Sequence, residues 1–377
     1  MIGGSLDAFI GAVHRKAAAL DGEIELVCGA FSSDPKKSKA TGEALYLNPQ
    51  RVYGSYAEMI EKEKNLPADQ RMDFVSIVTP NHVHFGPAKM ALENGFHVII
   101  DKPLAFSVAE AKQLKKIVEK TGLILALTHT YTGYPMVKEA KDFIASGKLG
   151  KVRKVFVEYP QGWLSTFLEK DGNKQASWRT DPSKSGQGGA IGDIGTHAAN
   201  LAEYITGADI TEINAVLNTV VKGRKLDDDS SMLIRFDNGA SGVLLATQVA
   251  AGDENNLNIR VYGEKGGIEW RQEEPNTLVV KWLDKPKEIF RAGWGYLSDA
   301  AKRNTRTPSG HPEGYLEAFA NIYMAFGRAV RDYKPGKKIN SAKYDFPDVE
   351  DGVKGMAFVE AVVKSSTSTK KWTAIKY

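Results

Sequence analysis

Asp193 and His197 stand four residues apart in the glycine-rich stretch GAIGDIGTH of residues 189–197. If this stretch is helical, the two side chains lie on one face, one turn apart. An imidazole titrates near neutral pH and suits a general base, and a neighbouring carboxylate favours its charged form. Taken singly, His197 is more often a satisfied core histidine and Asp193 a helix cap, so their chemistry depends on a wider pattern.

A glycine loop near the start of the chain has the spacing of a phosphate-binding turn. The sequence GGSLDA of residues 3–8 matches the dinucleotide fingerprint at its first and last positions and has Ser5 in place of the middle glycine. The loop opens an apolar helix, whose N-terminal amides can receive a pyrophosphate. The cofactor candidates here are Gly3, Gly4, Ser5, Ala8 and Phe9.

Only Met1 and Ile2 precede this loop, although a central strand normally has about five residues. Losing most of such a strand would leave neighbouring backbone groups unpaired. We therefore expect the natural product to begin several residues upstream.

Short apolar runs alternate with helical stretches through the first third of the chain. The runs read as strands buried on both faces and cover residues 24–31, 74–78, 96–100 and 123–127. Helices are expected over residues 8–19, 84–94 and 108–120, the last with a capping box at Ser107 and Glu110 and a stop at Gly122. This alternation predicts an α/β fold with a doubly wound parallel sheet, which binds ligands beyond the carboxyl ends of its strands.

Two further motifs follow these strands: TPNHVH at residues 79–84 and DKPLA at residues 101–105. In this order and at these separations, the glycine loop, both motifs and the GAIGDIGTH stretch resemble the Gfo/Idh/MocA oxidoreductases. That family uses a nicotinamide cofactor and acts mostly on sugars and cyclitols. The resemblance spans nearly the whole chain.

The resemblance implies roles for the motif residues. Lys102 is implied to sit beside the nicotinamide, in a motif that begins with glutamate in the family and with Asp101 here; Asp193 and His197 complete the catalytic site. Oxidising a secondary alcohol needs a base for the hydroxyl proton and a group that stabilises charge on the oxygen, and the sequence leaves open whether Lys102 or His197 takes the proton. The residues implied to border the cofactor are Thr79, Pro80, Asn81, His84, Asp101, Lys102 and Pro103.

The choice of dinucleotide depends on the end of the second strand, which reads FSSDPKK at residues 31–37. Ser32 and Ser33 stand where an NAD enzyme usually has its ribose-binding acid. Serine and lysine tolerate a 2′-phosphate, whereas Asp34 can serve the free ribose. NAD and NADP both remain open as the cofactor.

From about residue 151 the pattern changes to longer strands of period two. They cover residues 152–159, 213–221, 231–236, 242–249 and 257–262, with a DNG hairpin turn at residues 237–239. We expect one large, mostly antiparallel sheet with helices 196–205 and 313–331 on one face. The family resemblance implies that this sheet serves in a homodimer or homotetramer.

The expected domains are a Rossmann dinucleotide-binding domain at residues 1–130 and an α+β domain at residues 131–377. The second domain is expected to bind substrate and to mediate oligomerisation. A C-terminal helix at about residues 349–365 is expected to return to the Rossmann domain, as it does in the family.

The second domain should supply the substrate contacts. Tyrosine and tryptophan can cover the apolar face of a sugar ring while charged groups pair with its hydroxyls. WRTDP at residues 178–182 resembles the segment before the catalytic helix in sugar-acting family members, and HPEGY at residues 311–315 resembles a branch associated with sugars and glycosides. The substrate candidates are His129, Tyr159, Gln161, Trp163, Trp178, Arg179, Asp181, Arg306, His311 and Glu313.

Composition excludes several other classes. Fifty Lys and Arg against 46 Asp and Glu leave a thinly spread charge of +4, so we expect no nucleic-acid partner. The single cysteine, Cys28, excludes a disulfide framework, and the absence of an apolar run of about 20 residues argues against the membrane, so we expect a cytoplasmic protein. His82 and His84 form an H-x-H pair without a convincing third ligand, so we expect no metal site.

The leading hypothesis is an enzyme that transfers a hydride between a nicotinamide and a secondary hydroxyl or ketone of a sugar, glycoside or cyclitol. One alternative is a glycosidase that uses bound NAD to oxidise a ring carbon transiently. Another is a non-catalytic nucleotide-binding regulator. This hypothesis is based on Ser5, which replaces a glycine of the fingerprint, and on the short first strand.

Overall fold

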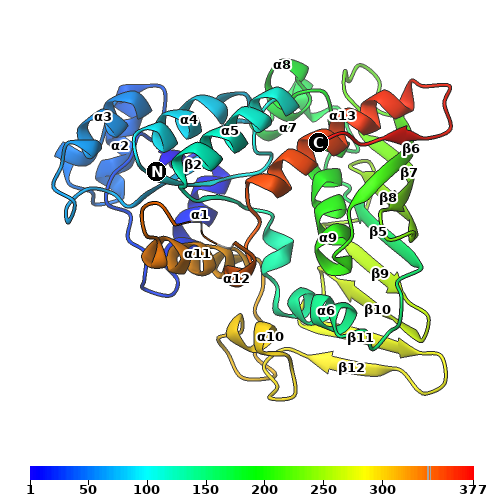
Figure 1. Ribbon diagram of the computed structural model, residues 1–377. Coiled ribbons are helices and arrows are strands. Elements are labelled where there is room, and N and C mark those ends of the chain that lie inside the picture. Colours follow the sequence, from blue (N-terminus) through cyan, green and yellow to red (C-terminus); the bar gives the residue numbers. More distant parts are fainter. Residues whose placement is uncertain (338, 340) are drawn as a thin grey trace. The chain divides into compact units, whose positions relative to one another are not determined.

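The computed structural model describes residues 1–337, 339 and 341–377, and the chain divides into two compact units (Figure 1). The first unit contains Met1–His129 and Phe319–Val353, and the second contains Thr130–Ala318 and Lys354–Tyr377. Helices α11 (Tyr315–Asp332) and α13 (Val349–Ser366) each contribute residues to both units. No helix among the described residues is both long and apolar enough to cross a membrane.

A parallel sheet of four strands forms the centre of the first unit, in the order β1-β2-β3-β4. The strands are β1 (Ile2–Gly3), β2 (Phe74–Val78), β3 (His97–Ile100) and β4 (Leu125–Leu127). Every residue of β3 and β4 is buried, as expected for a sheet covered on both faces. The predicted Rossmann sheet is confirmed.

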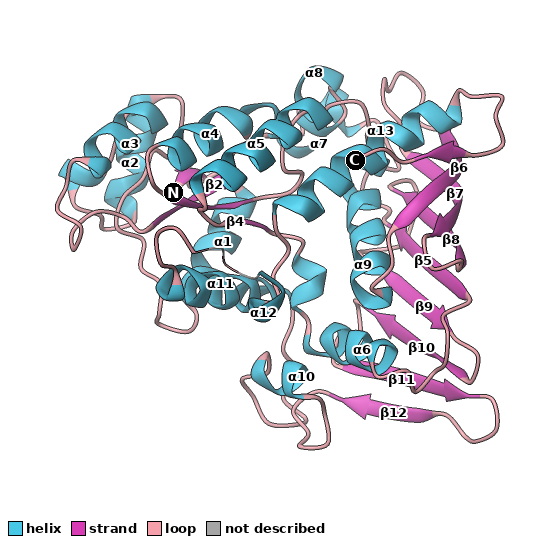
Figure 2. Ribbon diagram, viewed as in Figure 1, coloured by secondary structure: helices cyan, strands magenta, loops and turns pink. Residues whose placement is uncertain are grey.

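Helices cover both faces of this sheet: Figure 2 shows α4 and α5 along one face and α1 and α11 along the other. The predicted capping of α5 is present, because Ser107 Oγ accepts the Glu110 N–H at 3.2 Å and Gly122 ends the helix with a φ of 68°. The helices of the first unit, besides α11 and the start of α13, are α1 (Phe9–Ala19), α2 (Pro35–Ala44), α3 (Tyr56–Lys64), α4 (Phe85–Glu93), α5 (Val108–Thr121) and α12 (Ser341–Tyr344), with short 3₁₀ helices η1 (Pro49–Arg51) and η2 (Asn81–Val83).

The strand expected over residues 24–31 is wrong in length. Only single-residue bridges form there, between Ile2 and Ala30 and between Gly29 and Val52. On one side the run is hydrogen-bonded to residues 1–3, where Gly3 N–H donates to Ala30 O and Ala30 N–H donates to Met1 O, both at 2.9 Å. The branched composition of the run predicted a strand, but regular strand pairing is not formed along it.

The second unit contains a sheet of nine strands in the order β12-β11-β10-β9-β5-β8-β7-β6-β13. Among the described strands of this sheet, β5 and β8 pair in parallel and all the other neighbours are antiparallel. The expected large, mostly antiparallel sheet is therefore confirmed. Its strands are β5 (Lys154–Pro160), β6 (Ile210–Asn218), β7 (Asp229–Phe236), β8 (Ser241–Thr247), β9 (Asn258–Tyr262), β10 (Gly266–Arg271), β11 (Thr277–Trp282), β12 (Glu288–Arg291) and β13 (Thr373–Ala374).

Helices α6 (Pro135–Ala145) and α9 (Thr196–Thr206) lie along one face of this sheet (Figure 2). The core between them contains Val155, Val157, Ala198, Leu201 and Leu244. Alternate residues of β7 are exposed, so the opposite face of that strand meets solvent. The other helical segments of this unit are α7 (Lys174–Arg179), α8 (Pro182–Ser185), α10 (Asp299–Arg303), the π-helix Ile191–Gly195, and the 3₁₀ helices η3 (Thr130–Gly133) and η4 (Leu168–Asp171).

Helix α11 forms close to the predicted bounds, but its expected place on the antiparallel sheet is wrong. From Phe319 onwards it belongs to the first unit. Phe319 and Tyr323 contact the His14 ring of α1 edge-on, and Phe326 contacts Phe74 of β2 in the same way. The apolar face of α11 is thus buried against the parallel sheet.

Candidate active site

The glycine loop between β1 and α1 has the backbone geometry of a phosphate-binding turn. Gly3 and Gly4 have φ angles of 80° and 76°, a conformation that favours glycine. A Cβ on Gly11 would lie 2.3 Å from Gly4 Cα, so α1 packs directly on the loop because position 11 is glycine. Ala8 is the N-cap of α1, and none of the described side chains caps that helix end. The loop therefore fits a dinucleotide pyrophosphate.

The sequence assigned the closing position of the fingerprint to Ala8, but the close approach is made by Gly11. Gly11 lies within α1, three residues beyond the last position of the fingerprint, so the fixed spacing of the motif did not identify it.

Acidic and basic side chains flank this loop. Ser5 Oγ donates to Asp7 Oδ1 at 2.6 Å, and Lys37 Nζ lies 2.8 Å from Asp7 Oδ2. Asp34 caps α2 by accepting the Lys36 N–H at 2.9 Å, and it remains exposed to solvent. Lys37 is thus engaged by Asp7, and the Asp34 carboxylate is also exposed.

The TPN and DKP motifs follow β2 and β3 at the carboxyl edge of the parallel sheet. Thr79 Oγ1 is buried and has no hydrogen-bond partner among the described residues, which leaves a polar atom for a bound group. Asp101 accepts a hydrogen bond from Thr128 Oγ1 at 2.9 Å, and His14 Nε2 lies 3.6 Å from its carboxylate. Burial opposes ionisation of Asp101, but His14 and Lys102 hold its pKa well below the ordinary value.

His129 lies two residues after the end of β4, in the same unit, and is 2% exposed. Burial lowers the pKa of His129 to about 3, and the charge of Lys102 acts in the same direction. The ring is therefore neutral at physiological pH. A neutral imidazole can donate a hydrogen bond to a hydroxyl group or accept one from it, and it adds no charge beside the lysine.

The GAIGDIGTH stretch begins as a π-helix, Ile191–Gly195, and continues as α9. The sequence did not predict the π-helix, a feature that is frequent at functional sites. Asp227 fixes its start, because its two carboxylate oxygens accept the N–H groups of Gly189 at 2.6 Å and Ile191 at 2.8 Å. A Cβ on Gly189 would lie 2.0 Å from Asp227 O, so glycine is required there.

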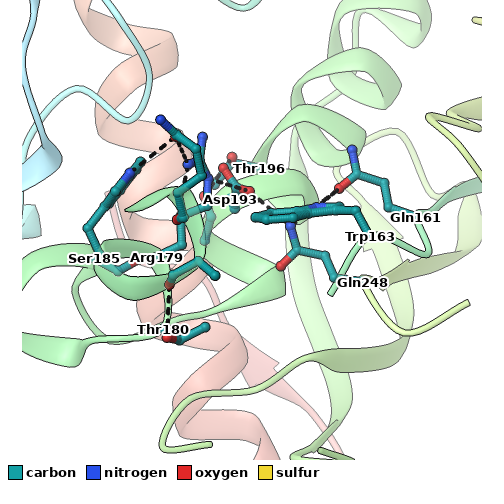
Figure 3. Close-up of polar contacts among 12 residues, drawn as sticks. Gln161, Trp163, Arg179, Thr180, Ser185, Asp193, Thr196 and Gln248 are labelled. Carbon is teal, nitrogen blue, oxygen red and sulfur yellow. Dashed lines mark hydrogen bonds and ion pairs between the residues drawn. The ribbon is translucent and has the colours of Figure 1, made fainter. Parts of the chain in front are cut away.

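Asp193 occupies the π-helix and is held by two side chains from other elements (Figure 3). Arg179 Nε lies 3.2 Å from its Oδ2, and Gln248 Nε2 donates to the same oxygen at 2.9 Å. Gln161 Oε1 accepts hydrogen bonds from Trp163 Nε1 at 3.0 Å and from Gln248 Nε2 at 3.3 Å. Sequence reasoning named Arg179, Trp163 and Gln161 but missed Gln248, which lies just after β8.

The network continues through Asn255 to two buried tyrosines. Asn255 Oδ1 accepts from Gln161 Nε2 at 2.6 Å and from Tyr159 Oη at 2.7 Å, and the hydroxyl groups of Tyr131 and Tyr159 are hydrogen-bonded. The Tyr131 ring lies edge-on to His197, with 4.9 Å between the ring centres. The candidates Asp193 and His197 thus belong to one polar cluster of the second unit, together with Tyr131 and Asn255, which the sequence did not single out.

The remaining substrate candidates lie at the margin of this cluster or outside it. The Arg179 guanidinium lies over the Trp178 ring, 4.2 Å from the centre of that ring. His311 is exposed on the loop before α11, and Arg306 pairs with Glu313 on the same loop. Asp181 caps the short helix α8 through the Ser183 N–H. Within the described ranges, no group of three His, Cys, Asp or Glu side chains could hold a metal ion.

Asp227 makes stability depend on pH. Burial raises the pKa of its carboxyl to about 6, against 3.8 ordinarily, and the neighbouring Asp228 acts in the same direction. The folded chain therefore binds this proton more tightly than the unfolded chain, and its stability falls as pH rises from about 4 to about 6 by an amount on the order of 3 kcal/mol. Relative to Asp227→Asn, the wild type should lose unfolding free energy across that window in denaturant titrations. A parallel pH dependence of the two proteins would contradict the assignment.

Comparison with known proteins identifies the group to which this chain belongs. Residues 1–129 match the model of an oxidoreductase family with an NAD-binding Rossmann fold, and residues 137–269 match the GFO/IDH/MocA C-terminal domain. The chain belongs to the Gfo/Idh/MocA oxidoreductase family. The predicted family membership is confirmed, and the chain is an oxidoreductase that acts on CH–OH groups with a nicotinamide dinucleotide.

Three similar proteins illustrate the relationship. An uncharacterized oxidoreductase of Bacillus subtilis, YfiI, is 31% identical over 100% of this chain and 96% of its own. An inositol dehydrogenase homolog of Azotobacter vinelandii, solved with NAD⁺, is 34% identical with a TM-score of 0.94 over 99% of this chain and 96% of its own; another of its structures holds NADH and myo-inositol. Levoglucosan dehydrogenase of Pseudarthrobacter phenanthrenivorans is 28% identical over 81% of each chain. Because these relatives are named as oxidoreductases and dehydrogenases, the comparisons favour an enzyme over the non-catalytic regulator.

Proposed function

We propose that this oxidoreductase is an NAD-dependent dehydrogenase that oxidises a secondary hydroxyl of an uncharged cyclic polyol, either a cyclitol or a sugar. The first unit serves as the dinucleotide-binding domain and the second as the substrate domain. The observation that carries the proposal is the cluster around Asp193, in which a carboxylate, amides and phenols are joined by hydrogen bonds.

The composition of this cluster favours hydroxyl groups over anionic groups. Apart from Asp193 and Arg179, it consists of neutral donors and acceptors, and the Arg179 charge is balanced by Asp193 at 3.2 Å and stacked on Trp178. A phosphate or carboxylate would have to compete with Asp193 for that cation. The Azotobacter homolog with myo-inositol and the levoglucosan dehydrogenase are consistent with a neutral ring as substrate.

In the proposed mechanism a bound nicotinamide supplies the hydride acceptor. His197 takes the hydroxyl proton as general base, and the Lys102 ammonium stabilises the negative charge that develops on the oxygen. Asp193, held by Arg179 and Gln248, accepts a hydrogen bond from a second hydroxyl and orients the ring. Trp163 covers an apolar face of the ring, as aromatic side chains do with sugars.

We propose NAD as the physiological cofactor, on the basis of charge. Asp34 is exposed at the N-cap of α2, where a carboxylate can bind ribose hydroxyls and repel a 2′-phosphate, and Lys37 is already paired with Asp7. We expect kcat/KM for NAD to exceed that for NADP by about tenfold or more, and Asp34→Ser to reduce the ratio by at least about tenfold. Steady-state kinetics with both cofactors measures this. An unchanged ratio in D34S would remove Asp34 from cofactor selection.

The exposed outer face of the nine-stranded sheet supports a homodimer or homotetramer. Val216 of β6 and Leu233 of β7 are 57% and 45% exposed in the single chain, and such apolar positions are commonly covered by a second subunit. Light scattering on the purified protein tests this, and a monomeric mass would reject it.

The function itself is tested with a panel of substrates. The purified protein is incubated with NAD and, in turn, inositols, anhydrosugars, free hexoses, hexose phosphates and hexopyranosides, while reduced nicotinamide is followed by absorbance and products by mass spectrometry. We expect sustained NADH formation with a neutral cyclic polyol and a product lighter by two hydrogens. Cleavage of a glycoside without NADH accumulation would instead indicate the glycosidase, and preference for the phosphates would contradict the neutral cluster.

A further inference from the structure

His84, which precedes α4, is completely buried in the first unit, and both of its ring nitrogens meet backbone carbonyl groups. Nδ1 lies 2.7 Å from the carbonyl oxygen of Pro103, and Nε2 lies 2.8 Å from the carbonyl oxygen of Thr79. The two carbonyls belong to different motifs, since Thr79 begins the TPN segment after β2 and Pro103 ends the DKP triplet after β3. His84 therefore bridges the ends of two neighbouring parallel strands.

The identity of the two partners bears on the protonation of the ring. A backbone carbonyl oxygen can only accept a hydrogen bond, whereas a neutral imidazole has one N–H and one lone pair. In either neutral tautomer one ring nitrogen would place its lone pair against a carbonyl oxygen at a hydrogen-bonding distance. Only the imidazolium form, with a proton on both nitrogens, makes both contacts favourable.

The charges around His84 are those of the DKP motif. Burial lowers the pKa of His84, and Lys102 acts in the same direction, while Asp101 and the two carbonyl groups raise it. Asp101 is itself ionised, since its pKa lies well below the ordinary value, and it also faces His14 and accepts a hydrogen bond from Thr128. The balance of these effects is downward, but the two short contacts argue for the charged ring, because a buried lone pair facing a carbonyl oxygen would be pushed apart rather than held at 2.7 Å.

We propose that His84 is a positioning residue: a buried, doubly protonated imidazolium that joins the Thr79 and Pro103 carbonyls and thereby fixes Lys102, which directly precedes Pro103. His84 was implied by the family resemblance to border the cofactor. Its ring is instead occupied by two backbone groups, so it acts through the segments that it holds. The inference rests on the proposed function only for the role of Lys102, and the protonation state is independent of any activity.

The protonation is tested by a neutron crystal structure of the unmodified protein grown at pD about 8, where an unperturbed histidine is neutral. We expect deuterium on both ring nitrogens of His84. His97 provides an internal control: it is buried in the same unit, its Nδ1 accepts the Ile124 N–H at 3.0 Å, and burial lowers its pKa to about 4. His97 should therefore carry no deuterium on Nδ1. A bare nitrogen on His84, or a ring that turns away from either carbonyl, would overturn the proposal.

The positioning role is tested with His84→Gln, since a side-chain amide can donate from one end only. We expect kcat to fall about 100-fold, as a shift of about 1 Å in a catalytic group does, while the Kd for NAD, measured by fluorescence titration, changes less than about fivefold. His97→Asn removes a buried histidine from the same unit and should leave kcat within a factor of about two. If H84Q instead raises the Kd for NAD in proportion and leaves kcat unchanged, His84 is a cofactor ligand and the positioning role is wrong. If the variant does not fold, the neutron structure still decides.

Discussion

Replacing Lys102 by Met should lower kcat by about 10³-fold, while the Kd for NAD stays within about threefold of the wild type. Methionine keeps much of the length and the apolar stem of lysine and removes the ammonium that stabilises the developing alkoxide. The Lys102 charge also acts on its neighbours: it helps to lower the pKa of Asp101, which is ionised, and the pKa of His129, which is neutral. The measurement is steady-state turnover with the polyol identified by the panel, together with fluorescence titration of NAD.

Lys115→Met is the matched control for this substitution. Lys115 lies on α5 in the same unit and forms a surface ion pair with Glu350 at 2.9 Å. Surface pairs contribute about 1 kcal/mol or less, so this variant should turn over like the wild type. Turnover of K102M within about threefold of the wild type would reject Lys102 as a catalytic residue.

Replacing His197 by Gln should lower kcat by about 10²- to 10⁴-fold, because a general base contributes an effect of that size. Glutamine retains a polar side chain of similar length but cannot take a proton. The loss should be largest near neutral pH and become smaller at alkaline pH, where hydroxide competes as the base. The pH–rate profile of the variant therefore tests the role more sharply than a single rate.

Rescue distinguishes loss of the base from loss of structure. Added imidazole should restore part of the activity of His197→Ala, because alanine leaves the space of the ring empty, whereas the glutamine of H197Q fills it; His197 itself is buried. It should not restore K102M, whose missing group is a cation and not a base. If H197Q keeps the pH profile of the wild type and K102M loses its alkaline limb, Lys102 is the base and the assignment of the two roles is reversed.

Much of the fold could be predicted because local composition and tertiary environment agree. The buried runs at residues 74–78 and 123–127 became strands β2 and β4, and the capping signals of Ser107 and Gly122 define α5 as expected. The pairing of residues 24–31 and the placement of α11 could not be predicted from local composition. Both depend on which distant backbone or apolar face is available, and a one-dimensional pattern does not contain that information.

The candidate site shows the same limit at the level of single residues. Asp193 and Arg179 were found because they belong to motifs, and the structure joins them at 3.2 Å. Gln248, Asn255 and Tyr131 were missed because neutral polar residues on strands and loops carry no spacing signal of their own. Gln248 is recognised only because β5 and β8 pair in parallel and bring it to Gln161, and Asn255 and Tyr131 are recognised only through their hydrogen bonds to that cluster.

The π-helix at Ile191–Gly195 is a further example. The expected helix began only at residue 196, and the spacing of Asp193 and His197 was interpreted on an ordinary helix. Asp227, more than thirty residues along the chain, accepts the N–H groups at its start. A substitution at Asp227 would therefore affect the stretch that carries Asp193 and His197 without altering its sequence.

The most direct test of the central claim follows the hydride itself. The protein is incubated with NAD and myo-inositol that carries deuterium on its carbinol carbons, and the reduced cofactor is analysed by mass spectrometry. We expect NADH that is heavier by one deuterium, formed together with an inosose lacking one deuterium. Reduced cofactor without the label, or no reduction of NAD by any cyclic polyol of the panel, would contradict the assignment of this chain as a polyol dehydrogenase.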